Sequence, residues 1–410
     1  MTIFILFSLD KITKMFYIIL VKIIKIYDWR LYGMLTQYSH VTKLNFNEIP
    51  CPVTSFLPCG IDIGYSAIKL QSPHNYSAIP SLVYKVAKDS ALLIEDTDIR
   101  YKDANGTVWY VGSLAKRALR KDNTNVKQTT LLSRQRLQSE EFMVQIRIAM
   151  FVAGLKELTD TGYIVDDRPL KIQTGLPPEF HLSDSKEIKS KFIGEHNFSI
   201  KIGNRQWFDV HLNVGKNDVY SCKQPFGTLM YCCVNNQGEF YNADFLRRNI
   251  LILDAGFHTT DTFCCIQGAD EGESITWENL AMQEVFKRTC EDISRNTNNI
   301  ADISVFALEK SLADEYVYYG PKKELYNFTK DFEKNLREVS HDLIEQIMTT
   351  YNNMIDIDVI VLTGGTGAAW YPFFKEYFSG LNTKIMLAGD EEATFSNVKG
   401  YYNLLISRFV

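Results

Sequence analysis

Three glycine-bearing turns in this sequence hold residues that could bind a phosphate group or a metal ion. The most specific of them is LILDAGFHTTD, in which Asp254 ends a wholly apolar run. A carboxylate at the end of a buried strand is costly without a partner, and a metal ion is a suitable partner. The turn that follows offers a permissive backbone, two hydroxyl groups and a second carboxylate: Gly256, Thr259, Thr260 and Asp261. We expect His258, in the same turn, to be a surface residue and not a catalytic base.

A second turn lies in CGIDIGYSAIKL, residues 59–70, where apolar residues alternate on either side of a tight bend. This pattern predicts a β-hairpin whose tip is surrounded by Asp62, Gly64, Tyr65, Ser66 and Lys69. Backbone amides at such a tip form an anion-binding concavity, to which Ser66 could add a hydroxyl and Lys69 a positive charge. Asp62 is suited to hold Mg²⁺ through water, because Mg²⁺ keeps several of its waters. An ordinary glycine turn with an exposed aspartate is the alternative.

The third turn, VIVLTGGTGAAW, follows a buried apolar run. Its glycines let the backbone approach a flat or charged ligand closely, and the candidate contacts are Gly364, Gly365 and Thr366. A helix is predicted to begin at Ala368. Taken alone this turn is weak evidence, since glycine turns also serve as plain entries into helices.

Short apolar strands and longer helical patterns alternate along the chain and must position these turns. Apolar runs and alternation predict strands at 170–176, 250–254 and 358–362, a second hairpin at 78–86 and a β meander over 198–219. Apolar residues at helical spacing predict helices over 140–158, 279–293 and 330–354. This alternation indicates an α/β architecture, in which ligands bind where the carboxyl ends of strands gather.

Composition places the chain among folded proteins with a sizeable core. Of its 410 residues, 46% are hydrophobic and 23% are charged, and the length suggests two or three domains. The net charge of −5 gives no general attraction to a phosphate backbone, so direct nucleic-acid binding is not expected. The eight cysteines show no zinc-binding spacing and are expected to be reduced and mostly buried.

The first 33 residues are rich in Ile and Phe but are interrupted by lysines. No uninterrupted apolar run reaches the roughly 18 residues that a membrane span needs, and Asp10 and Lys11 break the apolar region that a signal peptide requires. Three interpretations remain: a disordered or loosely docked tail, an amphipathic surface helix, or translated sequence upstream of a true start at Met34. We favour the last of these.

The order of the three turns resembles the phosphate-one, phosphate-two and adenosine motifs of the superfamily of actins, sugar kinases and heat-shock chaperones. Three further stretches are similar to its ParM and archaeal actin-like branch: GLPPEF at 175–180, CKQPFGTL at 222–229 and NVKGYYNLL at 397–405. The resemblance covers roughly residues 58–409. It implies an α/β, actin-like two-lobed ATPase fold, with two RNase H-like domains and a nucleotide cleft between them.

The resemblance also implies a division of the chain. An N-terminal extension at 1–56, either disordered or upstream of the true start, precedes domain I at 57–174 and domain II at 175–385. A closing helix at 386–410 returns to domain I. Outer insertions are expected at about 85–138 and 295–330. Phe257 departs from the pattern, because many relatives carry a second glycine at this place.

The activity that the resemblance implies is ATP hydrolysis with Mg²⁺, with GTP as the alternative nucleotide. Asp62 and Asp254 would hold the metal ion through water and Gln224 would orient the attacking water, so these three are the implied catalytic residues. Relatives polymerise in the ATP-bound state and move plasmid or phage DNA through an adaptor of the ParR kind. The implied partners are copies of this chain and such an adaptor, in the bacterial cytoplasm, without direct contact to nucleic acid or membrane.

Three other functions of the same fold stay open. Sugar-type kinases usually carry GGT or GTS at the first hairpin and an aspartate base near the interlobe strand, whereas this chain has DIGYS there and Pro177-Pro178-Glu179 after the strand. A chaperone would need a peptide-binding domain after the closing helix. A non-polymerising scaffold or cell-division protein is the third alternative.

Overall fold

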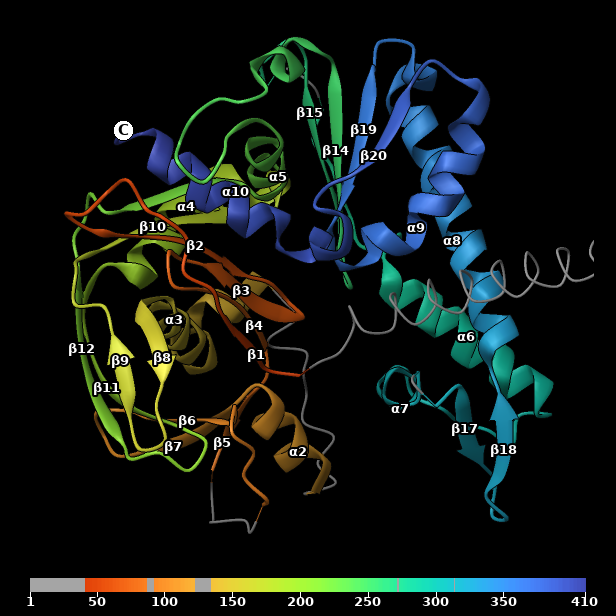
Figure 1. Cartoon of the computed structure of the whole chain (residues 1–410). Coiled ribbons are helices and arrows are strands. Elements are labelled where there is room, and N and C mark those ends of the chain that lie inside the picture. The colour runs from red at the N-terminus through yellow and green to blue at the C-terminus, as the bar shows by residue number, and fades with distance from the viewer. Residues whose placement is uncertain (1–40, 87–91, 122–133, 271–272, 313) are drawn as a thin grey trace, which may run out of the picture.

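The computed structural model of the chain describes residues 41–86, 92–121, 134–270, 273–312 and 314–410. These residues form two halves, each built around its own mixed sheet (Figure 1). Every helix in this part of the chain is too short or too polar to reach across a lipid bilayer. The expectations for the first 33 residues lie outside the described residues.

The first half contains a six-stranded sheet in the order β1-β4-β3-β2-β10-β13. The antiparallel hairpin β2–β3 lies at its centre, with β4 antiparallel beside β3 and with β10 and β13 parallel beside β2. The bounds are β1 (Lys43–Phe46), β2 (Leu57–Ile63), β3 (Ala67–Gln71), β4 (Asn75–Pro80), β10 (Leu170–Leu176) and β13 (Val219–Lys223). Because β2 is buried along its whole length, packing fixes its carboxyl end, where Asp62 lies.

The second half repeats this pairing pattern in a five-stranded sheet ordered β16-β15-β14-β19-β20. The antiparallel hairpin β14–β15 is flanked by one antiparallel strand, β16, and by two parallel strands, β19 and β20. The first half has the same pattern with a further antiparallel strand, β1, at its edge. The bounds are β14 (Ile250–Ala255), β15 (Thr260–Cys265), β16 (Thr276–Trp277), β19 (Val359–Thr363) and β20 (Lys384–Leu387). The repeated pattern confirms the expected two-lobed α/β fold.

Helices cover both sheets, and their sequences explain their positions. Helix α3 (Glu140–Gly154) begins at Ser139, whose hydroxyl accepts a hydrogen bond from the Phe142 N–H, and is buried along most of its length. Helix α8 (Thr329–Thr350) buries residues three or four apart, as an amphipathic helix does. The other α-helices are α2 (Ser113–Lys121), α4 (Pro178–Phe192), α5 (Gln224–Cys233), α6 (Met282–Asn296), α7 (Val305–Lys310), α9 (Gly364–Tyr377) and α10 (Ser396–Ser407). The 3₁₀ turns are η2 (Arg134–Gln138), η3 (Ala243–Arg247), η4 (Asn352–Met354), η5 (Phe378–Gly380) and η6 (Asp390–Phe395).

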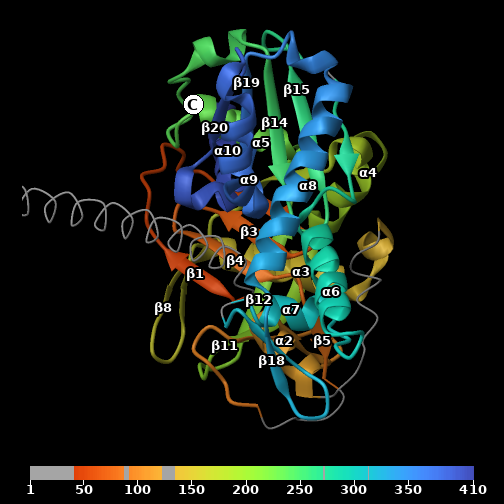
Figure 2. The ribbon, with the colours of Figure 1, turned by 90° about the vertical axis from the view of Figure 1, so that its right-hand side faces the viewer.

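Each half also has an outer part, and α2 with β5 lies at the same end of the molecule as α7 with β17 and β18 (Figures 1 and 2). In the first half the outer part is an antiparallel sheet in the order β12-β11-β6-β7-β5. It shares one hydrophobic core with the first sheet, and α3 lies between the two sheets. The bounds of this sheet are β5 (Val83–Lys85), β6 (Ile99–Lys102), β7 (Val108–Val111), β11 (Gly194–Ile202) and β12 (Phe208–Val214). Two small hairpins form separate sheets: β8 (Leu155–Leu158) with β9 (Tyr163–Val165), and β17 (Tyr316–Tyr319) with β18 (Glu324–Asn327) in the second half.

The last helix, α10, joins the two halves by lying against β2 and α5 (Figure 1). A Cβ atom added at Gly400 of α10 would lie 1.6 Å from the carbonyl oxygen of Gly227 in α5. A Cβ atom added at Gly60 of β2 would lie 2.2 Å from the carbonyl oxygen of Val398. The backbones of these three elements are therefore in direct contact, which only glycine permits at these positions.

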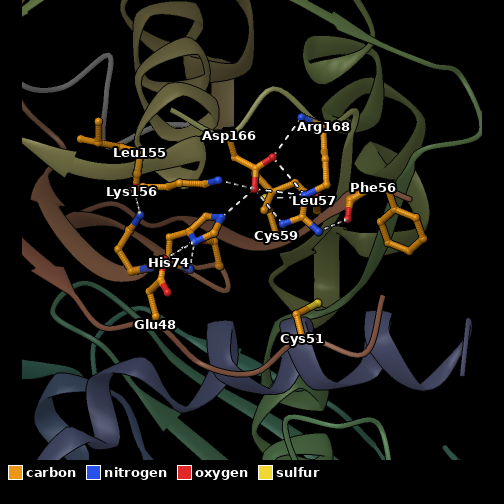
Figure 3. A network of polar contacts seen from close by, with 12 residues as sticks. Glu48, Cys51, Phe56, Leu57, Cys59, His74, Leu155, Lys156, Asp166 and Arg168 are labelled. Atoms are coloured by element: carbon orange, nitrogen blue, oxygen red, sulfur yellow. Dashed lines mark hydrogen bonds and ion pairs between the residues drawn. The ribbon is translucent and has the colours of Figure 1, made fainter. Parts of the chain in front are cut away.

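A network of charged side chains fixes the segment before β2 to the first half (Figure 3). Asp166 accepts hydrogen bonds from Arg168 Nη2 and His74 Nε2, each at 2.7 Å. Arg168 Nη1 donates to the carbonyl oxygens of Val53 at 3.1 Å and Phe56 at 3.2 Å. Burial would raise the pKa of Asp166, but the hydrogen bonds from Arg168 hold this pKa well below its usual range. The ionised network thus anchors part of the segment that we assigned to an N-terminal extension, and β1 in the same segment adds an edge strand to the sheet.

Three predicted elements of the first half differ from the structure. The hairpin predicted at 78–86 is wrong, because β4 ends at Pro80, which cannot donate to a strand ladder, and β5 starts a different sheet at Val83. The predicted meander over 198–219 is only partly correct, since β11 and β12 pair but β13 pairs with β10 in the other sheet. The helix predicted to residue 158 ends at Gly154, after which β8 pairs with β9.

Candidate functional site

The first turn forms the predicted hairpin and brings a carboxylate opposite a cation. Asp62 on β2 is the register partner of Lys69 on β3, and the Gly64 N–H donates to the Ala67 carbonyl oxygen at 3.1 Å. A Cβ atom at Gly64 would lie 2.8 Å from that oxygen, so the turn has no room for a side chain. Burial raises the pKa of Asp62 to about 6, and the Lys69 ammonium opposes this shift. The tip thus combines amide N–H groups with charges of both signs.

The second turn is also a hairpin, and it brings two carboxylates together. Asp254 on β14 is the register partner of Asp261 on β15, and the Gly256 N–H donates to the Thr259 carbonyl oxygen at 2.8 Å. Asp261 accepts hydrogen bonds from the hydroxyls of Thr276 at 2.6 Å and Thr259 at 3.3 Å. Burial and the charge of Asp254 raise the pKa of Asp261 to about 7. Burial likewise raises the pKa of Asp254.

The third turn packs directly against the second. Gly364 has a φ of +80°, and a Cβ atom there would lie 2.5 Å from Asp254 Oδ1. The hydroxyl of Thr366 donates to the carbonyl oxygen of Gly256 at 2.7 Å. Helix α9 begins at Gly364 and not at Ala368 as expected, so the glycines form the first turn of the helix. The close approach of this turn holds the Asp254 carboxylate in place.

Gln224 lies at the first position of α5, between the two hairpins. Its Nε2 donates to Asp62 Oδ2 at 3.4 Å. Burial is the main cause of the raised pKa of Asp254, and hydrogen bonds with Asn397 and Gln224 oppose it. The Tyr401 hydroxyl donates to the Gln224 carbonyl oxygen at 3.1 Å, which ties the start of α5 to α10. One amide side chain therefore contacts carboxylates from both halves of the molecule.

The three turns and the start of α5 line one narrow pocket of about 50 Å³. The predicted residues that line it are Asp62, Gly64, Tyr65, Ser66, Lys69, Gln224, Asp254, Gly256, Thr259, Asp261 and Gly364. The other three predicted contacts do not line it. Gly365 follows Gly364, which does line the pocket. The Thr260 hydroxyl donates to the Leu280 carbonyl oxygen, and the Thr366 hydroxyl donates to the Gly256 carbonyl oxygen.

Four residues of the lining were not predicted as ligand contacts: Arg136, Pro177, Phe257 and His258. The Phe257 ring packs against Phe286 at 5.6 Å between centroids, so it belongs to the core of the second half. His258 is half-buried and not a plain surface residue, its Nδ1 contacts Gln283 Oε1, and burial lowers its pKa. No local pattern in the sequence marks Arg136, because it comes from a different part of the chain from the three turns.

A wider cavity of about 300 Å³ opens beside the narrow pocket. The two share Tyr65, Pro177, His258 and Thr259. Helix α6 and the residues before it supply the polar side of the wider cavity: Glu278, Asn279, Gln283, Glu284 and Lys287. A narrow charged pocket that continues into a larger polar one fits a ligand with a phosphate end and a bulkier organic end.

The charges of the narrow pocket favour an additional cation. Three carboxylates and two cations line it: Asp62, Asp254 and Asp261 against Lys69 and Arg136. A phosphate entering this net-negative lining alone would be repelled, whereas a divalent cation would compensate the buried carboxylates. Among the described residues, no group of three or more His, Cys, Asp and Glu side chains could hold a metal ion directly. Mg²⁺ bound through its own waters fits the two carboxylates that meet at Gln224.

Two similarly paired sheets whose central hairpins meet at one pocket form a two-lobed α/β fold of the actin type. Residues 60–227 match the family described as "Actin like proteins N terminal domain". No curated protein sequence matches the chain. Residues 60–227 are thus similar to the N-terminal domain of the actin-like proteins.

Solved structures show that the fold extends through the described chain. A non-polymerisable quadruple mutant of pCBH ParM is 19% identical, with 86% of this chain and 99% of that chain covered and a TM-score of 0.66. A subunit of a 15-stranded ParM filament from Clostridium botulinum is 20% identical, with 87% and 100% covered and a TM-score of 0.64. An archaeal actin homologue in complex with ADP is 14% identical, with 85% and 99% covered and a TM-score of 0.60. The chain therefore has the actin-like fold that its three turns imply.

Proposed function

We propose that this chain is an ATP hydrolase that binds ATP with Mg²⁺ in the narrow pocket and polymerises into nucleotide-dependent filaments. The observation that carries the proposal is the convergence of Asp62, Asp254 and Gly364, from three distant turns, on one pocket. The archaeal actin homologue solved with ADP and the ParM filament support nucleotide binding and self-assembly by analogy of fold. GTP is the alternative nucleotide.

The phosphates are held by groups that need no rearrangement during the reaction, which is how phosphoryl transfer is mainly accelerated. Amide N–H groups at both hairpin tips and the hydroxyl of Ser66 donate to phosphate oxygens. The Thr259 hydroxyl, which donates to Asp261 in the free protein, would turn toward the phosphates when the nucleotide binds. Lys69 supplies positive charge beside the first tip. Bound Mg²⁺ would neutralise charge on the phosphates, and Asp62 and Asp254 would hold its waters.

Gln224 orients the attacking water in this mechanism. An amide can both donate to and accept from water without a shifted pKa. We expect Gln224→Ala to keep ATP affinity within about twofold of wild type but to lose about 100-fold in phosphate release, a loss typical of a missing group that acts in the transition state. Gln138→Ala, at an exposed glutamine outside the pocket, is the matched control. Unchanged turnover in Gln224→Ala would refute the role of this amide.

We further propose that ATP-bound subunits form filaments that segregate plasmid or phage DNA in the bacterial cytoplasm, through a DNA-binding adaptor of the ParR kind. The acidic net charge of −5 fits contact with DNA through an adaptor and not directly. Ninety-degree light scattering of the full chain on addition of Mg-ATP tests assembly. A rise with a critical concentration supports the proposal, whereas flat scattering together with ATP-dependent phosphorylation of a sugar indicates a small-molecule kinase instead.

A further inference from the structure

Arg136 places a positive charge at the pocket from outside the three turns. It belongs to η2, which directly precedes α3, and only 9% of its surface is exposed. Its guanidinium carbon lies 4.0 Å from the ring centroid of Tyr65, and its Nη2 donates to the Ile63 carbonyl oxygen at 2.7 Å. Arg136 thus contacts the end of β2 and the first hairpin tip.

This buried charge has no ionic partner among the described residues. The guanidinium has five N–H donors, and the hydrogen bond to Ile63 uses one of them. No carboxylate of the described chain forms an ion pair with Arg136, and Asp62 acts on it only as a nearby charge. Burial lowers its pKa, yet a guanidinium stays protonated in proteins. Among the described residues, the other N–H groups of the guanidinium make no hydrogen bond, so they are available to an anionic ligand in the pocket.

The position of Arg136 indicates which part of a nucleotide it would meet. Arg136 lines the narrow pocket but not the wider cavity beside α6. Tyr65 and His258 line both spaces and stand at 6.0 Å between ring centroids, so they mark the border. Because Arg136 lines the narrow pocket and not the wider cavity, a nucleotide whose base and sugar occupy the wider cavity would present its phosphate chain to Arg136.

We propose that Arg136 binds the terminal phosphate group of the nucleoside triphosphate, a role that rests on the proposed function. The planar fork of donors suits a phosphate, which can accept two parallel hydrogen bonds from it. Tyr65 stacks on the same guanidinium, so binding of the terminal phosphate also fixes the tip of the first hairpin. Arg136 lies in the expected outer insertion of the first half, so the terminal phosphate would add a contact between that insertion and the pocket.

The test compares the affinities of ATP and ADP, each with Mg²⁺, for wild type, Arg136→Gln and Arg136→Lys. The matched control is Arg247→Gln, because the Arg247 side chain is 84% exposed and lies outside the pocket. For Arg136→Gln we expect ATP binding to weaken by about tenfold or more and ADP binding by less than about threefold, as for loss of a charged hydrogen-bonding fork to one phosphate. Arg136→Lys should fall between wild type and Arg136→Gln.

Thermal unfolding of the nucleotide-free proteins separates ligand binding from a structural role. Removal of an unpaired buried charge should leave the Tm of Arg136→Gln unchanged or raise it, while the rise in Tm caused by ATP becomes smaller. A lower Tm with an unchanged ratio of ATP to ADP affinity would mean that Arg136 only supports the hairpin, and it would overturn the proposal. Equal affinities of wild type and Arg136→Gln for ATP would also overturn it. If wild type binds neither nucleotide, the proposed function itself fails.

Discussion

Gly400 of α10 rests directly on the backbone of α5, so a single added methyl group should force these helices apart. A Cβ atom at Gly400 would lie 1.6 Å from Gly227 O, 2.5 Å from Gly227 C and 2.9 Å from Tyr231 N. All three are backbone atoms, which cannot rotate away as the end of a side chain can. Restoring an ordinary separation of about 3.5 Å requires the two helices to move apart by more than about 1 Å.

We expect Gly400→Ala to lower the free energy of unfolding by about 3 kcal/mol or more. Overpacking costs about 1–3 kcal/mol even where side chains can yield, and here only backbone can move. The same displacement would carry Gln224 and Asn397 away from the carboxylates that they contact. ATP hydrolysis by the folded fraction of the variant should therefore fall as well.

Urea denaturation followed by circular dichroism measures the change in unfolding free energy. Gly380→Ala is the matched control, because a Cβ atom at Gly380 meets nothing within 4 Å, and its effect should stay within about 0.5 kcal/mol. If Gly400→Ala were as stable as this control, the helices could not be in backbone contact. The account of how α10 joins the two halves would then be refuted.

Two further substitutions test the electrostatics and the positioning of the site. The pKa of Asp261 is about 7 in the folded protein and near 4 in the unfolded chain. Its protonated form therefore stabilises the nucleotide-free protein fully below about pH 4, and this contribution is lost as the pH rises through about 7. In Asp261→Asn, much of the fall in unfolding free energy between pH 5 and 8 should disappear. At pH 8 the nucleotide-free variant should be more stable than wild type by on the order of 2 kcal/mol. An unchanged dependence of unfolding free energy on pH would contradict this. Tyr401→Phe removes the hydrogen bond to the Gln224 carbonyl oxygen and should cost about 1 kcal/mol of stability. It should also lower kcat with little change in ATP affinity, and equal kcat values would exclude a positioning role for Tyr401.

The turns of the site could be predicted because their signals are local. Glycines, hydroxyls and carboxylates follow apolar strands within a few residues, and this pattern identified both hairpins and the lining carboxylates Asp62 and Asp254. Local signals do not show where a hydroxyl points. Thr260 and Thr366 therefore appeared equivalent to Thr259, although both donate to backbone oxygens instead.

Features that depend on contacts between distant segments could not be predicted. Arg136 reaches the pocket only because α3 packs between two sheets, and nothing next to it in the sequence indicates this. The strand β13 was expected in a meander with its neighbours, yet its pairing with β10 decides which sheet it joins. Alternation of apolar residues shows which side chains of a strand face the core, but it does not show which strand it pairs with.

The closing helix α10 explains how two halves with separate carboxylates can act as one site. Asp254 accepts a hydrogen bond from Asn397 Nδ2 at 2.6 Å, and an ionised carboxylate can only accept. Asn397 must then turn its carbonyl oxygen to Thr228, whose hydroxyl donates to it at 2.7 Å. Thr228 belongs to α5, the helix that begins with Gln224, and α10 also contacts the backbone of β2, which carries Asp62. The halves therefore cannot move apart without breaking these hydrogen bonds or separating the glycine contacts, so a ligand held by these carboxylates would lie directly beside the joint between the halves.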